Sequence, residues 1–144
     1  MTTTVRVITA SPAEVWAVLS DGWLYPAWVV GASRMRRVSE DWPAVGAIID
    51  HSVGTWPALI DDVTDVVRSE PERLLELHAQ ANPAGEATVV MRLDPVEDGT
   101  RVEMEEHVIG GPGRLVPQQV VGWGMRKRNE ESLRRLAFIA ERRH

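Results

Sequence analysis

A run of segments with a two-residue hydrophobic period most constrains what this chain can fold into. The segments are bounded by turn signals such as SEPE, NPAGE and EDGT, and these connections are too short to hold crossover helices. The pattern therefore predicts an antiparallel meander in which each strand pairs with the next. The six expected strands span residues 33–40, 44–54, 58–70, 73–80, 86–95 and 100–109.

A strand and two short helical segments are expected before this run. TVRVIT (residues 4–9) alternates as a strand does. The following SPAE predicts a helix start, with Ser11 as N-cap, Pro12 at the first helical position and Glu14 reaching back to the cap. WLYPAWVVGA (residues 23–32) indicates a second short helix or turn.

One long helix is expected after the turn at residues 110–113. Its apolar stripe consists of Leu133, Leu136, Ala137 and Ala140. Stepping back along the same stripe at about 100° per residue gives Asn129, Arg126, Gly122 and Gln119. The second half would pack on the sheet, whereas the first half offers small and polar residues to the same side. Those residues meet either solvent beyond the sheet or a ligand beneath the helix.

Length and composition restrict the class of protein. We expect one domain over residues 1–144 whose stability depends on its apolar core, because the chain has no cysteine. No basic segment leads into a long apolar run, and nowhere do about 18 apolar residues follow one another, so a cytoplasmic protein without membrane spans is expected. Fifteen of the 16 basic residues are arginine, which indicates a GC-rich bacterial genome.

Charge is divided unevenly along the chain. Residues 40–106 carry 16 acidic and 4 basic side chains, whereas residues 107–144 carry 8 basic and 3 acidic ones. This predicts an acidic, solvated sheet face and a helix with a basic outer face. Nucleic acid is not an expected partner, because the basic segment lacks interleaved aromatic residues and the net charge of the chain is −5.

Candidate site residues follow from strand alternation. In TRVEMEEHVI, Val102, Met104 and Glu106 share one face, so Glu106 points toward the apolar side and needs a partner. Arg126 on the helix stripe is the expected partner, in a structural ion pair, a ligand-contacting pair, or with Glu106 as a general acid. Met91 and Met104 are expected to line the same space, as cavity wall or as plain core.

The stretch IIDHSVGTWP, residues 48–57, leaves the role of His51 open. If Ile49 and Val53 point inward then so does His51, but if Ile48 points inward then Asp50 and Ser52 do instead. Gly54 marks a bend before Trp56. His51 is therefore a core residue, a ligand contact or a catalytic base. No histidine pair has metal-ligand spacing, so neither a metal nor a cofactor is expected.

The order of elements resembles the START-like, or SRPBCC, superfamily, in its polyketide cyclase/dehydrase and lipid transport branch. The resemblance runs from VRVITASPAEVWAVLSD and WLYPAW to RNEESLRRLAFIAE. It implies an α+β helix-grip fold, with a curved antiparallel sheet of about seven strands around the C-terminal helix and a hydrophobic cavity between them. It also implies that Trp28 bounds the cavity entrance or anchors the core, and that His51 beside Trp56 is a polar ligand anchor.

Three functions are compatible with this resemblance. The first is binding or transport of a small hydrophobic ligand, contacted by residues drawn from the helix stripe and the strands: Trp28, His51, Trp56, Met91, Met104, Glu106, Gly122, Arg126 and Asn129. The second is a polyketide cyclase, aromatase or dehydratase using His51, Glu106 and Arg126. The third is a protein-interaction module. A homodimer remains open.

Overall fold

The computed structural model describes residues 1–55, 58–81, 85–111 and 118–142. Seven antiparallel strands form one sheet in the order β1-β7-β6-β5-β4-β3-β2. The strands are β1 Thr2–Ile8, β2 Ala32–Val38, β3 Ile48–Thr55, β4 Ala58–Glu70, β5 Leu74–Ala81, β6 Gly85–Val96 and β7 Gly99–Gly110. Strands β2 to β7 are thus a meander, which confirms the expected topology, and β1 pairs with the last of them.

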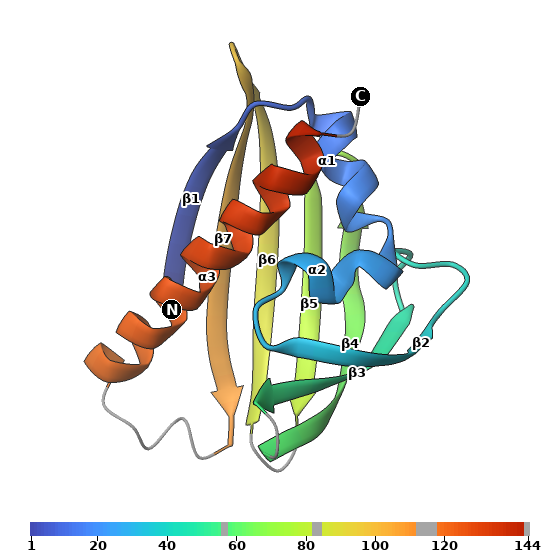
Figure 1. Cartoon of the computed structure of the whole chain (residues 1–144), viewed down its shortest axis with the longest axis vertical. Coiled ribbons are helices and arrows are strands. Elements are labelled where there is room, and N and C mark those ends of the chain that lie inside the picture. Colours follow the sequence, from blue (N-terminus) through green and yellow to red (C-terminus); the bar gives the residue numbers. More distant parts are fainter. Residues whose placement is uncertain (56–57, 82–84, 112–117, 143–144) are drawn as a thin grey trace.

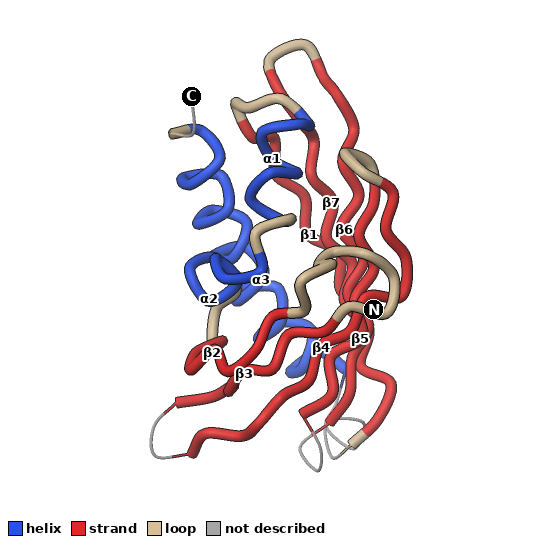
Figure 2. Tube along the Cα trace, turned by 90° about the vertical axis from the view of Figure 1, so that its right-hand side faces the viewer, coloured by secondary structure: helices blue, strands red, loops and turns tan. Residues whose placement is uncertain are grey.

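The helices lie on one face of this sheet. They are α1 Pro12–Leu19, the 3-10 turn η1 Gly22–Leu24, α2 Tyr25–Trp28 and α3 Gln118–Glu141. Figure 1 shows α3 crossing the sheet obliquely, and Figure 2 shows the sheet curving so that β2 and β3 pass beneath α2. The helix-grip arrangement expected from the sequence is confirmed. Within the described residues, no helix is long and apolar enough to cross a membrane.

The start of α1 forms as its sequence predicts. The Ser11 hydroxyl oxygen accepts the backbone N–H of Glu14 at 3.1 Å, and the Glu14 carboxylate accepts the backbone N–H of Ser11 at 2.9 Å. Both are otherwise unpaired donors of the first turn, so this capping box fixes where the helix begins.

Turn chemistry sets two of the strand ends. The EDGT segment closes the β6–β7 hairpin, and a Cβ added at Gly99 would clash with the Ile8 carbonyl, so this position requires glycine. Residues 44–47 were expected at the start of β3 but form a turn and loop instead. Gly46 there has a φ of 89°, and its N–H donates to the Val66 carbonyl at 2.9 Å, so the chain turns before the strand begins.

The core lies between the sheet and the second half of α3. Leu133, Leu136, Ala137 and Ala140 are all buried, as the helix stripe predicts. They pack with buried residues of β1, α1 and the inner sheet face, among them Ile8, Val15, Val18, Leu75, Met91 and Val102. The first half of α3 extends beyond this core. The space beneath it is where the polar side chains of the inner face gather.

Candidate functional site

A cavity of about 280 Å³ lies between the inner face of the sheet and the helices α2 and α3. Its walls are largely apolar: Trp28, Val29, Val53, Leu77, Ala79, Val89 and Met104. Its polar lining residues are Tyr25, His51, Asp62, Glu106, Arg128, Asn129 and Ser132. The combination of an apolar body with a few converging polar groups is typical of a small-molecule site.

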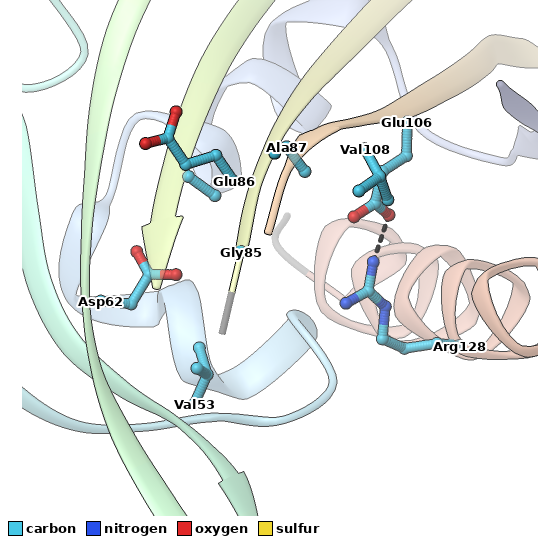
Figure 3. A pocket seen from close by; sticks show the side chains of 10 residues that line it. Val53, Asp62, Gly85, Glu86, Ala87, Glu106, Val108 and Arg128 are labelled. Atoms are coloured by element: carbon cyan, nitrogen blue, oxygen red, sulfur yellow. Dashed lines mark hydrogen bonds and ion pairs between the residues drawn. The ribbon is translucent and has the colours of Figure 1, made fainter. Parts of the chain in front are cut away.

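A second pocket of about 260 Å³ adjoins this cavity near the ends of β6 and β7. The two spaces share Val53, Asp62, Ala79, Glu106 and Arg128 as lining residues. Figure 3 shows Glu106 and Arg128 facing each other on one side of the pocket, with Asp62 and Val53 on the other side. This outer pocket therefore offers a route from the strand ends to the inner cavity.

Tyr25, Thr64 and Asp62 form a chain of neighbouring polar groups at the cavity wall. The Thr64 hydroxyl donates to Oδ1 of Asp62 at 2.9 Å. Thr64 also acts on the Tyr25 hydroxyl, in the direction that lowers its pKa. Burial, together with the nearby Asp62 carboxylate, raises the pKa of Tyr25 well above its usual value, so Tyr25 keeps its proton.

His51 packs against this chain from β3. Its ring lies 5.1 Å from the Tyr25 ring, in an edge-on arrangement, and the residue is only 2% exposed. Burial lowers the pKa of His51, although Asp62 and the Ile49 carbonyl act in the opposite direction. His51 is therefore neutral at pH 7, and its Nδ1 has no hydrogen-bond partner of normal geometry among the described residues.

Glu106 is paired with Arg128, not with Arg126 as the sequence suggested. Nη2 of Arg128 donates to Oε1 of Glu106 and lies 3.4 Å from Oδ1 of Asn129. Arg126 is exposed. Helix phase does not explain the difference, because Arg126 lies about 60° from the buried Asn129 around the helix and Arg128 lies about 100° away on the other side. The long Arg128 side chain nonetheless reaches Glu106 from beside the stripe.

Five of the residues expected at a ligand site line the cavity together: Trp28, His51, Met104, Glu106 and Asn129. The cavity lining decides the face of β3 that was ambiguous, since His51 and Val53 both line the cavity and Ile49 on the same face is buried. Ser52 on the other face is also buried and accepts from Arg36. Met91 is fully buried but belongs to the core and not to the cavity lining. Gly122 lies in the second turn of α3, and Trp56 lies outside the described residues.

Sequence reasoning missed Tyr25, Asp62, Thr64 and Arg128. Alternation from the buried Val66 places Thr64 and Asp62 on the same face, so period two contained the signal. The opposite face of β4 carries further valines that are partly exposed, which made the apolar side of this strand indistinct. No group of three or more histidines, aspartates and glutamates among the described residues is placed to hold a metal ion.

The fold and its cavity define a helix-grip protein of the SRPBCC type. The chain belongs to the polyketide cyclase/dehydrase and lipid transport family, whose model matches residues 1–141. No sequence among the curated proteins matches it significantly.

Solved structures with this fold include proteins of several bacteria. A Rhodobacter sphaeroides protein is 26% identical, with a TM-score of 0.75 over 99% of this chain and 92% of its own. The Thermus thermophilus protein TTHA0849 is 15% identical, with a TM-score of 0.77 over 96% of this chain and 95% of its own. The di-domain ARO/CYC StfQ from the steffimycin biosynthetic pathway is 12% identical, with a TM-score of 0.79; the match covers 98% of this chain and 50% of StfQ. At these identities, the last two comparisons concern the fold alone.

Proposed function

We propose that this protein binds or carries a small hydrophobic molecule in the cavity beneath the first half of α3. The observation that carries the proposal is the lining of this cavity: apolar walls from α2, β5, β6 and β7 surround a few buried polar groups. Such a lining excludes water from the body of a ligand and orients it by its polar atoms. A volume of about 280 Å³ favours a compact ligand over a long-chain lipid.

A pair of tryptophan substitutions on β6 tests this proposal. Val89 lines the cavity, whereas Val90, the next residue, points to the other face of the sheet. We expect Val89→Trp to fill the cavity and abolish binding of N-phenyl-1-naphthylamine, a neutral fluorescent probe, and Val90→Trp to retain binding. Native mass spectrometry of the purified protein looks for a co-purifying hydrophobic compound. If folded Val89→Trp binds the probe as tightly as the unmodified protein does, the ligand binds elsewhere and the proposal is wrong.

A cyclase, aromatase or dehydratase is the second candidate, and the buried acid–base groups favour it. A neutral His51 can accept a proton at the wall of the cavity that the carboxyl groups of Asp62 and Glu106 also line. An enzyme of this kind would lose turnover in His51→Ala while a non-reacting substrate analogue still bound. Loss of both together would indicate a binding role for His51 and count against catalysis.

A protein-interaction module is the third function that the sequence left open. It would be favoured by an exposed apolar patch on a molecule with no internal cavity. The cavity lined by Trp28, Leu77 and Met104 is the opposite arrangement, so a small-molecule role has the stronger support.

A further inference from the structure

Asn129 presents a buried hydrogen-bond donor to the cavity without a protein acceptor. Its side chain is 0% exposed, and its Nδ2 has no partner among the described residues. The neighbouring Arg128 fixes which way the amide points, because its Nη2 faces Oδ1 at 3.4 Å and a guanidinium can only donate. The NH₂ group is therefore the free end. A buried donor without a partner is costly, and a ligand oxygen would relieve that cost.

Asp62 presents the opposite chemistry on the sheet side of the same cavity. It is buried, and the Thr64 hydroxyl satisfies only part of the acceptor capacity of its carboxylate. The remaining capacity of Asp62 is suited to a hydroxyl group of a ligand.

Charge at this site argues against an anionic ligand. Three charged side chains line the cavity, and two of them, Asp62 and Glu106, are carboxylates. The third, Arg128, is already paired with Glu106. On β2, Arg36 also lies close enough to affect His51, but it is paired with Asp61 at 3.1 Å. A ligand carboxylate would thus enter a site with surplus negative charge and no free cation in the described part of the chain.

We infer that the ligand is a neutral hydroxy-carbonyl compound, whose carbonyl oxygen accepts from Nδ2 of Asn129 and whose hydroxyl donates to Asp62. This rests on the proposed binding function and sharpens it, because it excludes free fatty acids and other carboxylates. The apolar walls contribute affinity without choosing among such molecules. Selectivity among hydrophobic molecules comes from the Asn129 donor, the Asp62 acceptor and the negative local charge.

Three naphthalene probes separate these contributions: 6-hydroxy-2-acetonaphthone, 2-acetonaphthone, which lacks the hydroxyl, and 6-hydroxy-2-naphthoate, in which a carboxylate replaces the ketone. Binding is measured by competition against N-phenyl-1-naphthylamine at about pH 8, where the naphthoate is ionised. We expect the hydroxyketone to bind at least about tenfold more tightly than the naphthoate, and several-fold more tightly than the ketone alone.

Two variants reverse or remove this selectivity. Glu106→Gln frees Arg128 to bind a carboxylate, so the naphthoate should bind at least about tenfold more tightly. Glu105→Gln is the control: it removes the same charge from the outer face, where Glu105 pairs with Arg92, and should leave naphthoate affinity unchanged. Asn129→Leu should weaken the hydroxyketone about tenfold and leave N-phenyl-1-naphthylamine binding intact.

The outcomes distinguish the two levels of the proposal. Equal or tighter binding of the naphthoate by the unmodified protein overturns the inference while leaving hydrophobic binding in place. Unchanged hydroxyketone affinity in Asn129→Leu overturns the role of Asn129, even if Glu106→Gln fails to fold. If the neutral fluorescent probe itself does not bind, the proposed function fails and the inference falls with it.

Discussion

Replacing Arg128 by Met leaves the Glu106 carboxylate without its cationic partner at the cavity wall. The two side chains are unequally exposed, 42% for Arg128 and 8% for Glu106. We therefore expect Arg128→Met to lower the free energy of unfolding, because a nearly buried charge loses its hydrogen bond while the lost arginine was partly solvated. Methionine keeps the apolar stem of the side chain, so that packing changes little.

The magnitude follows from where this pair lies between two limits. Breaking a fully buried ion pair by removing one partner costs about 3–5 kcal/mol. An exposed pair contributes about 0–1 kcal/mol. With one partner buried and the other nearly half exposed, we expect a loss of about 2 kcal/mol. Arg126→Met is the matched control, and because Arg126 is exposed it should change stability by less than about 0.5 kcal/mol.

Urea unfolding followed by tryptophan fluorescence measures both variants, and a double-mutant cycle with Glu106→Gln isolates the pair. Removing the carboxylate as well should recover much of the loss, giving a coupling energy of about 1–2 kcal/mol. Equal losses in Arg126→Met and Arg128→Met, or zero coupling in the cycle, would refute the assignment of Arg128 as the partner of Glu106.

Three further predictions concern stability. Burial holds the folded-state pKa of His51 below its ordinary 6.5, so the unfolded chain binds more protons than the folded one as the pH falls through that value, and stability is lost. His51→Gln should therefore lose less stability than the unmodified protein between about pH 7.5 and 5.5. An identical pH profile of the two proteins would count against a buried neutral ring. Leu136→Ala should cost about 3 kcal/mol because this side chain is fully buried, whereas Phe138→Ala, half exposed on the same helix, should cost less than about 1 kcal/mol; similar midpoints in urea would contradict the packing of α3. Ser11→Ala removes the acceptor for the Glu14 N–H and should lower the thermal unfolding free energy by about 1 kcal/mol, while an unaltered melting temperature would show that the capping box contributes nothing.

The fold could be predicted because its local signals agree. Turn residues at the hairpins, alternation along β7 and the apolar stripe that ends at Ala140 all indicate the same arrangement of sheet and helix. Alternation also placed Glu106 on the inner face, since its neighbours Met104 and Val102 are apolar and the opposite face of that strand is charged.

The site could be predicted only in part, because side-chain reach and tertiary packing decide it. For His51, two adjacent isoleucines precede the residue, so period two alone allowed either face. For the partner of Glu106, the helix stripe indicates Arg126, but the flexible Arg128 side chain reaches the sheet from beside the stripe. Asp62 could be assigned an inward position only from its strand neighbours, because buried carboxylates are rare.

Two turns of α3 have different roles, and this difference affects which substitutions the protein can accept. Leu133, Leu136 and Ala140 hold the helix on the core, whereas Arg128 and Asn129, one turn earlier, face the cavity. Substitutions that change ligand specificity therefore fall on a different turn from those that hold the helix on the core. Neighbouring turns of one helix can thus evolve under separate selective pressures, and a change at Arg128 costs the pairing of Glu106 while leaving the packing of the helix on the core intact.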